Sequence, residues 1–215
     1  MKYYRLKRAL CSIMDSETMV EGYDYGAADS VYHWKENHLS PNLFSVKLNR
    51  GVVPKDIVEC APASNADVLI ISDDLYNVLL SYNISTHELA PVRIVGTKGI
   101  YTNYHYLYFK NSIPENFIDF GRSLFHYDKF ENGGWLKLDI MPTISCIRDI
   151  KAKKIDGISG PNLTHLSFTS DMTYDVFYLA IWAKFVIVVT DAVKDACEEK
   201  GIKGVAFEEL PFTRG

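Results

Sequence analysis

The sequence VLIISD at residues 68–73 is echoed 118 residues later by VIVVTD at residues 186–191. Each run consists mainly of β-branched and aliphatic residues, which is typical of a buried strand. Each ends on a hydroxyl residue, Ser72 or Thr190, followed by an aspartate. A hydroxyl oxygen there can accept from the free amides of a helix's first turn, and the aspartate meets the positive end of the helix dipole. We therefore interpret both hydroxyl residues as helix N-caps rather than as catalytic groups.

Apolar residues at helical spacing follow each run and predict one helix after each. The second helix is expected to end at Gly201, a glycine that follows a lysine, and the first near Asn83. An extended segment comes after each helix. The sequence thus predicts two echoed strand–helix–strand units, at about residues 67–95 and 185–210, within an α+β fold that has a mixed sheet.

The rest of the chain is predicted to belong to the same domain. A length of 215 residues suits one domain or two, and no Ser/Gly linker or charge block divides the chain. We therefore expect a single domain over residues 1–215, in which residues 1–60 are the least well-defined part. Further predicted elements are an N-terminal strand, a strand at Val46–Leu48, a short helix or turn from Ile113 to about Phe125, a turn at Asn132–Gly134 and a helix at Ile144–Ile155.

A tyrosine-rich strand is predicted between the two units. Residues 101–109 place Tyr104, Tyr106 and Tyr108 on one side and alternate them with other residues on the opposite side. Aromatic residues on a sheet can stack nucleic-acid bases, but this segment has no Arg or Lys before Lys110, so the cationic half of such a surface is missing. A sheet face packed by aromatic residues is the preferred interpretation.

Composition and charge exclude several classes of protein. Hydrophobic residues make up 47% of the chain and charged residues 23%, so there is enough apolar surface for a folded core. The net charge of −4 disfavours a nucleic-acid binder. The longest apolar run, residues 177–189, is interrupted by Lys184 and is too short to span a membrane. The four cysteines are far apart and no signal peptide is predicted, which together indicate the cytoplasm.

No catalytic, cofactor-binding or metal-binding residue is predicted. The six histidines show no i, i+4 pair of the kind that binds zinc on a helix, and no phosphate-binding glycine loop or GxSxG motif is present. A Cys/His/Asp site assembled by the fold stays open as an alternative, because such groups need not be close in sequence.

Acidic residues are concentrated in two windows that contain no Lys or Arg, at residues 9–34 and 59–92. Two solvated acidic faces would explain this pattern, and so would a docking surface for a basic protein. In the first window, aromatic residues beside the acids could anchor an interface. The residues predicted to bind a partner are Asp15, Glu17, Glu21, Tyr23, Asp24, Tyr25 and Asp29.

Two parts of the chain resemble bacterial polymorphic-toxin immunity proteins of the Myxococcus-type immunity domain, long classed as a domain of unknown function. These parts are residues 67–75 with 91–94 and residues 186–191 with 201–207. Members typically carry a strand–Ser–helix unit and then a Tyr-rich strand, which is similar to Tyr104–Ile113 here. The resemblance covers about residues 60–210 and rests on hydrophobic patterns and caps. The family often has Trp where this chain has Phe120, and its motif carries no catalytic residues.

The resemblance implies a cytoplasmic immunity protein that binds and blocks a cognate toxin by occlusion, without a cofactor or catalysis of its own. The toxin is expected to be basic and to attack a cytoplasmic target such as nucleic acid, whereas this chain contacts neither nucleic acid nor membrane directly. The alternatives are a small cytoplasmic hydrolase with a convergent Cys/His/Asp site and a self-associating structural module that forms a homo-oligomer.

Overall fold

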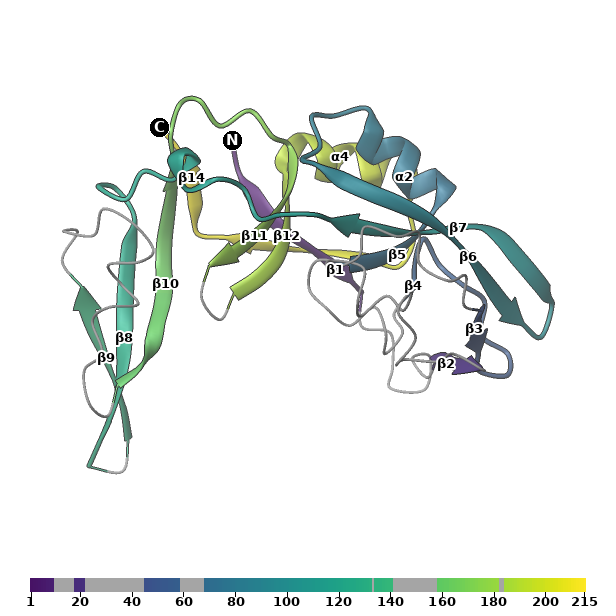
Figure 1. The fold of residues 1–215 in the computed structure, drawn as a ribbon, viewed down its shortest axis with the longest axis horizontal. Coiled ribbons are helices and arrows are strands. Elements are labelled where there is room, and N and C mark those ends of the chain that lie inside the picture. The colour runs from purple at the N-terminus through teal and green to yellow at the C-terminus, as the bar shows by residue number, and fades with distance from the viewer. Residues whose placement is uncertain (10–17, 22–44, 59–67, 133, 141–157, 182–183) are drawn as a thin grey trace.

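A computed structural model describes residues 1–9, 18–21, 45–58, 68–132, 134–140, 158–181 and 184–215 (Figure 1). Within these ranges two α-helices accompany three sheets, two of which are mixed, and strands predominate, so the fold is α+β or mostly β. The helix predicted at Ile144–Ile155 lies outside the described residues. In the described part of the chain, no helix is long and apolar enough to cross a membrane.

The first sheet places the N-terminal strand in its interior. Its order is β11 (Val176–Ile181), β12 (Lys184–Thr190), β1 (Tyr3–Arg8) and β13 (Val205–Leu210), and every neighbouring pair is antiparallel. The predicted N-terminal strand is therefore confirmed. It pairs with the strands that precede and follow the second predicted helix.

The second sheet is built around a long hairpin, in which β6 precedes β7. Its order is β2 (Thr18–Glu21), β3 (Ser45–Leu48), β6 (His87–Gly96), β7 (Gly99–Phe109), β5 (Val68–Ser72) and β4 (Ile57–Val58). Only β3 and β6 pair in parallel among these described strands. The strand predicted at Val46–Leu48 is β3, one residue longer.

The tyrosine-rich strand β7 has the alternation that its sequence predicts. Tyr104, Tyr106 and Tyr108 are buried in one core, while Leu107 and Phe109 are buried in another on the opposite face of the sheet. The tyrosines therefore form part of a packed sheet face, as expected.

The third sheet extends away from the helices (Figure 1). Its order is β14 (Phe212–Arg214), β10 (Ile158–Phe168), β8 (Leu124–Glu131) and β9 (Gly134–Ile140), with β14 parallel to β10. The turn predicted at Asn132–Gly134 falls between β8 and β9, where Asn132 has a φ of +52° and Gly133 lies outside the described residues. The helix or turn predicted from Ile113 to Phe125 is too long, because only one turn of 3-10 helix, η4 (Glu115–Phe117), forms before β8 begins.

Both predicted helices form, but only one has the predicted side-chain cap. Helix α2 (Asp73–Leu80) begins after Ser72, whose hydroxyl oxygen accepts from the Leu75 amide at 3.2 Å. Helix α4 (Asp191–Glu199) begins after Thr190, whose hydroxyl makes no such bond. It donates instead to the carboxylate of Asp175 at 3.3 Å, so the prediction of a Thr190 side-chain cap is wrong.

The two helices also end differently. Gly201 has a φ of +68°, and the amides of Gly201 and Ile202 donate to the carbonyls of Glu198 and Cys197. This pattern is a Schellman motif, which confirms the predicted glycine end of α4. Helix α2 ends at Ser81 in a right-handed conformation, and Asn83 does not adopt a positive φ.

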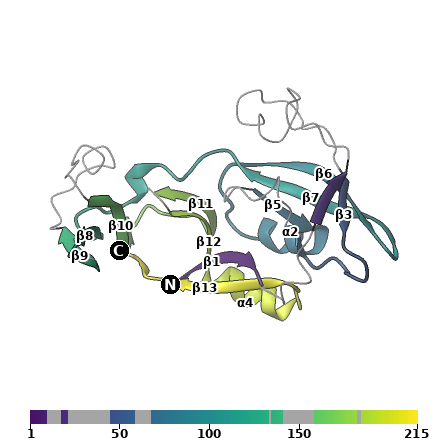
Figure 2. The same ribbon diagram turned by 90° about the horizontal axis from the view of Figure 1, so that it is seen from below.

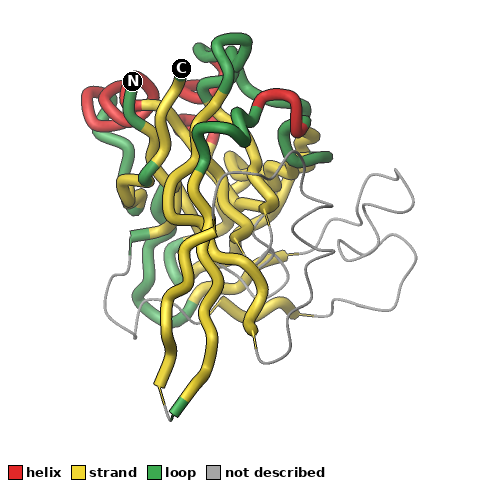
Figure 3. Tube along the Cα trace, turned by 90° about the vertical axis from the view of Figure 1, so that its left-hand side faces the viewer, coloured by secondary structure: helices red, strands yellow, loops and turns green. Residues whose placement is uncertain are grey.

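The first sheet is buried on both faces, between the helices and the third sheet. Val176 and Tyr178 face the core beneath the helices, which contains Leu75, Leu79, Val193 and Cys197. We call this the helix core. Figure 2 shows the same elements turned by 90°, and Figure 3 shows the helices gathered at one end of the molecule.

The opposite face of the first sheet packs on the third sheet. Phe177 and Leu179 alternate with the residues of the helix core and contact a second cluster, which is rich in phenylalanine. We call this second cluster the aromatic core. Its ring contacts include Phe168 with Tyr3 at 4.9 Å between centroids and Phe168 with Phe177 at 5.5 Å.

The close approach of Gly204 to Lys55 gives a first prediction. Gly204 has a φ of +78°, and a Cβ atom added there would lie 2.6 Å from the Lys55 Cβ. Gly204→Ala should therefore lower the free energy of unfolding by about 1–3 kcal/mol, through overpacking and backbone strain. Urea denaturation checks this, with Gly201→Ala as the matched control, since Gly201 also has a positive φ but open space around it. Equal losses in the two variants would contradict the clash.

The Tyr3 hydroxyl gives a second prediction. Tyr3 is 1% exposed, and its hydroxyl has no hydrogen-bond partner among the described residues. Tyr3→Phe should leave the free energy of unfolding unchanged or raise it by up to about 1 kcal/mol, because it removes an unpaired buried polar group. Tyr82→Phe is the control, since it removes a hydroxyl that does donate a hydrogen bond. A loss for Tyr3→Phe as large as that for Tyr82→Phe would refute the prediction.

Candidate functional site

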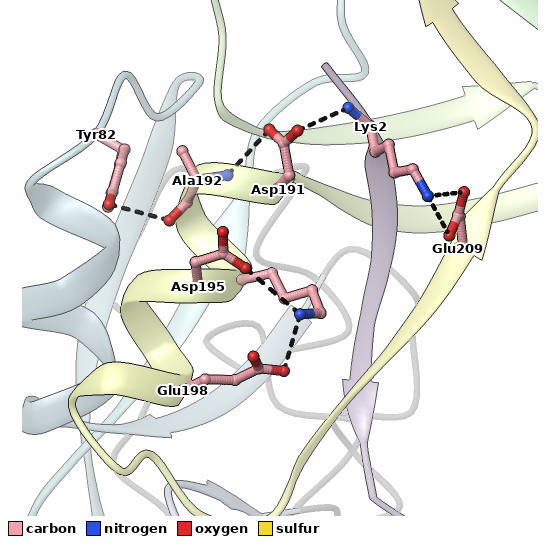
Figure 4. A network of polar contacts seen from close by, with 8 residues as sticks. Lys2, Tyr82, Asp191, Ala192, Asp195, Glu198 and Glu209 are labelled. Carbon is pink, nitrogen blue, oxygen red and sulfur yellow. Dashed lines mark hydrogen bonds and ion pairs between the residues drawn. The ribbon is translucent and has the colours of Figure 1, made fainter.

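The two helices meet where the turn after α2 reaches the first turn of α4. The Tyr82 hydroxyl, two residues beyond α2, donates to the Ala192 carbonyl at 3.1 Å (Figure 4). The Asp191 carboxylate, at the start of α4, accepts from the Ala192 and Lys2 amides. These bonds fix the first turn of α4 to both α2 and β1.

Asp56, just before β4, fixes the start of α2 to the turn after α4. Its carboxylate accepts from the Ser72 hydroxyl at 2.5 Å and from the Lys203 amide at 2.6 Å. Its backbone also takes part, because the Asp56 amide donates to the Lys203 carbonyl and the Asp56 carbonyl accepts from the Ser72 amide. One aspartate thus joins two segments that are far apart in sequence.

Asp175, just before β11, makes the matching contacts for the other helix. Its carboxylate accepts from the Thr190 hydroxyl at 3.3 Å and from the Asn83 amide at 3.2 Å. The Asp175 amide donates to the Asn83 carbonyl, and the Asp175 carbonyl accepts from the Thr190 amide. Asp175 therefore joins the start of α4 to the turn after α2. We call Asp56 and Asp175 the bracing aspartates.

An open groove of about 1150 Å³ lies beside this braced helix pair. One wall is the face of α2 that carries Asp74, Asn77 and Val78, together with Ser81 just after the helix. The other wall is the end of α4 with the turn that follows it. The segment before β4 closes a third side. The lining residues are Val53–Asp56, Asp74, Asn77, Val78, Ser81, Tyr82, Ala196 and Glu199–Lys203.

The groove combines apolar side chains with charges that are available for a partner. Asp74 and Glu199 are exposed, and neither has an ion-pair or hydrogen-bond partner for its carboxylate among the described residues. The side chains of Lys200 and Lys203 are likewise exposed and unpaired within that part of the chain. The Asp56 carboxylate, in contrast, is occupied by its two donors.

Several charges near the helix pair but outside the groove are paired with each other. On α4, Lys194 lies 2.9 Å from Glu198 and 3.5 Å from Asp195, and these carboxylates raise the pKa of Lys194 (Figure 4). Glu209 on β13 does the same for Lys2. Because exposed pairs of this kind contribute little to stability, their main effect is to reduce the free charge on this surface.

Of the residues predicted to bind a partner, the structure describes Glu21. Glu21 ends β2, at an edge of the second sheet among the described strands. The other predicted residues, Asp15, Glu17, Tyr23, Asp24, Tyr25 and Asp29, lie outside the described residues. Their role as a docking surface stays a prediction.

Two of the three described acids in the second acidic window, residues 59–92, already have a side-chain partner. Asp73 lies 2.6 Å from the His105 ring on β7, and Glu88 on β6 pairs with Lys110. Glu59 and Asp67 lie outside the described residues. Of the three acids that can be placed, only Asp74 is unpaired, and Asp74 lines the groove.

The described residues offer little for nucleophilic or metal chemistry. Cys197 is fully buried in α4, and this burial raises the pKa of its thiol to about 11, so it stays protonated at neutral pH. Among the residues that the structure describes, no group of three His, Cys, Asp or Glu side chains could hold a metal ion. The other three cysteines lie outside the described ranges.

Buried acidic groups predict how stability depends on pH. Burial raises the pKa of Cys197 to about 11 and the pKa values of Tyr3 and Tyr104 to about 12. Since these groups ionise more easily when unfolded, their contribution to stability is complete below about pH 9 and is lost as the pH rises through 9 to 12. Urea titrations from pH 7 to 11 should show a constant free energy of unfolding that falls only above about pH 9. A decline that begins near pH 7 would contradict this.

Sequence reasoning missed the residues that shape the site. Neither bracing aspartate stands in a recognisable motif, and each acts on residues brought near it by the fold. The local signals at the groove were Asp74 in the second acidic window and the glycine end of α4, with Gly201 and Gly204 on either side of Ile202 and Lys203. The comparisons add no relative: no family model matches this chain, and a search of curated proteins found no match.

Proposed function

We propose that this chain is an immunity protein, which binds a cognate toxin and blocks it by occlusion without catalysis of its own. The observation that carries the proposal is the groove beside α2 and α4. It opens next to helices that are otherwise fixed in place, and it presents unpaired charges around apolar side chains. The resemblance of residues 60–210 to toxin-immunity proteins supplies the functional class.

The composition of the groove suits a protein partner. Protein interfaces typically have an apolar centre within a polar rim, and a few anchoring residues supply most of the binding energy. Val78, Ile202 and Val53 offer the apolar surface here, while Asp74 and Glu199 offer charges on the rim. The bracing aspartates keep these groups in fixed positions, which reduces the entropy lost on binding.

The proposed partner is a basic toxin that attacks a cytoplasmic target such as nucleic acid. The acid-rich window at residues 9–34 supports a basic partner, while the groove offers free charges of both signs, from Asp74 and Glu199 and from Lys200 and Lys203. Opposite charges on two proteins accelerate their encounter and select the correct partner. In the same proposal the protein is a single domain that works in the cytoplasm, where a free buried thiol such as that of Cys197 is stable.

We also infer that residues 67–95 and 185–210 are echoed units with the same arrangement of strands and helix. The strand order β4-β5-β7-β6 in the second sheet corresponds to β11-β12-β1-β13 in the first. In both series a helix connects the second strand to the fourth, and an aspartate before the first strand braces the other unit. In the first sheet, the N-terminal strand β1 takes the place that β7 occupies in the second sheet.

Gel filtration with the product of the neighbouring gene tests the proposed function. Genes for immunity proteins of this kind usually sit beside the gene for their toxin. The expected result is a stable complex that elutes earlier than either protein, and that also suppresses the toxin's activity. An unrelated toxin domain of similar charge is the control. Separate elution of the two neighbouring products would refute the proposal.

A further inference from the structure

We propose that the groove beside α2 and α4 receives a tyrosine side chain from the partner, in the way that the opposite end of the helix pair holds Tyr82 of this chain. This inference rests on the proposed function for the identity of the partner. The groove itself can be tested without that partner.

The two ends of the helix pair can be compared through the bracing aspartates. Asp175 exchanges backbone and carboxylate hydrogen bonds with Asn83, and Asp56 exchanges the same bonds with Lys203. Asn83 and Lys203 therefore occupy matching positions. The residues that precede them, Tyr82 and Ile202, match as well, and both pack against the helix core.

Two side-chain hydrogen bonds link neighbouring segments at the end of the helix pair that contains Tyr82. The Tyr82 hydroxyl donates to the Ala192 carbonyl at 3.1 Å, and the Asn83 side-chain amide donates to the Thr173 carbonyl at 3.0 Å. The Tyr82 and Asn83 side chains thereby link the end of α2 to the start of α4 and to the segment before β11.

The opposite end lacks both groups. The groove begins there and runs along the helix pair as far as Ser81 and Tyr82. Ile202 is shorter than tyrosine and has no hydroxyl, and the side chain of Lys203 makes no hydrogen bond among the described residues. The groove is lined by Ile202, Lys203 and Asp74. Asp74 corresponds to Ala192, because each is the second residue of its helix. The structure thus shows which side chain fills the matching place, and that side chain is a tyrosine.

The chemistry of the lining suits a phenol. Val78, Ala196 and Ile202 provide an apolar contact surface for the ring. Asp74 and Asn77 have side-chain oxygens with no partner among the described residues, and either can accept a hydrogen bond from the phenol hydroxyl. Tyrosine is also enriched among the anchoring residues of protein interfaces, because it combines a large rigid ring with a polar tip.

The first test asks whether the groove binds a phenol ring at all. The full chain, labelled with ¹⁵N, is titrated by NMR with N-acetyl-L-tyrosinamide, and N-acetyl-L-alaninamide is the control. We expect the tyrosine derivative to bind with a Kd of about 1–10 mM and to shift the amides of Asn77, Ala196 and Glu199. The alanine derivative should leave them unchanged. Equal effects of the two compounds, or shifts confined to other surfaces, would overturn the proposal.

The second test fills the groove from within the chain and measures toxin binding. Ile202→Tyr supplies the missing ring, and we expect it to weaken binding of the neighbouring gene's product at least tenfold. Asn77→Trp obstructs the groove from an exposed position on α2, so it should fold even if Ile202→Tyr does not. Leu80→Tyr is the matched control, because Leu80 is exposed on α2 but does not line the groove.

The outcomes separate this inference from the proposed function. If the wild-type chain binds the toxin and a folded Ile202→Tyr or Asn77→Trp variant binds it within twofold of wild type, the toxin docks elsewhere and the inference fails. If the wild-type chain does not bind the toxin, the proposed function fails, and the titration with N-acetyl-L-tyrosinamide alone decides whether the groove is a site for a phenol ring.

Discussion

Replacing Phe168 with alanine is expected to lower the free energy of unfolding by about 3–5 kcal/mol, the largest effect that we predict for a single substitution. Phe168 is fully buried near the end of β10. Its ring contacts those of Tyr3, Phe177 and Phe212, which belong to the first sheet and to β14. Alanine would leave a cavity where the third sheet joins the first, because the surrounding strands cannot collapse completely onto the smaller side chain.

Urea denaturation followed by circular dichroism measures this loss, and two variants serve as controls. Phe168→Leu keeps most of the apolar volume and should cost distinctly less. Leu124→Ala removes an exposed side chain from the same sheet and should change stability by less than about 0.5 kcal/mol. If Phe168→Ala were no more destabilising than Leu124→Ala, the aromatic core would not hold the first and third sheets together.

The second large effect is expected at the bracing aspartate Asp56. Asp56→Ala should lower the free energy of unfolding by about 2–4 kcal/mol, because it removes a charged acceptor from the Ser72 hydroxyl and the Lys203 amide. The loss would loosen the start of α2 and the turn after α4 together. For a chain of this length it corresponds to a fall in Tm of roughly 4–16 °C.

Thermal denaturation of three variants checks this prediction. Asp56→Asn keeps one side-chain carbonyl oxygen and should lose less stability than Asp56→Ala. Asp74→Ala removes a neighbouring carboxylate that has no partner among the described residues, and should cost about 0.3–1 kcal/mol through the helix dipole. Equal losses for Asp56→Ala and Asp74→Ala would show that the hydrogen bonds of Asp56 contribute nothing specific.

The elements that were predicted correctly have strong local signals. The β-branched runs before residues 73 and 191 are strands, and the glycine after Lys200 ends a helix in the way its position indicates. The tyrosine alternation in β7 reports which side chains share a face, because strand periodicity is fixed by the backbone. Each of these signals lies within a few residues of the structure that it specifies.

The errors arose where tertiary contacts compete with a local preference. Thr190 has the right position and side chain for an N-cap, but Asp175 on the neighbouring segment attracts its hydroxyl. Ser72 meets the same competition and satisfies both, since its oxygen accepts from Leu75 while its proton goes to Asp56. A sequence alone does not indicate that an aspartate fifteen or sixteen residues upstream will lie beside each hydroxyl.

The groove could not be predicted for a similar reason. Its walls come from the segment before β4, from α2 and from the turn after α4, and the contact between Asp56 and Lys203 spans 147 residues of sequence. Individually, these residues are ordinary surface positions. What distinguishes them is the replacement of Tyr82 and Asn83 by Ile202 and Lys203 at matching positions, and that comparison requires the fold.

Hydrogen–deuterium exchange of this protein with and without the neighbouring gene's product tests the central claim most directly. If the chain is an immunity protein that docks its toxin in the groove, the complex should slow exchange of backbone amides at residues 53–56, 74–82 and 196–203, while the β6–β7 hairpin tip at residues 96–100 should exchange as it does in the free protein. A stable complex that leaves all three groove segments unprotected would contradict this account of where and how the protein binds.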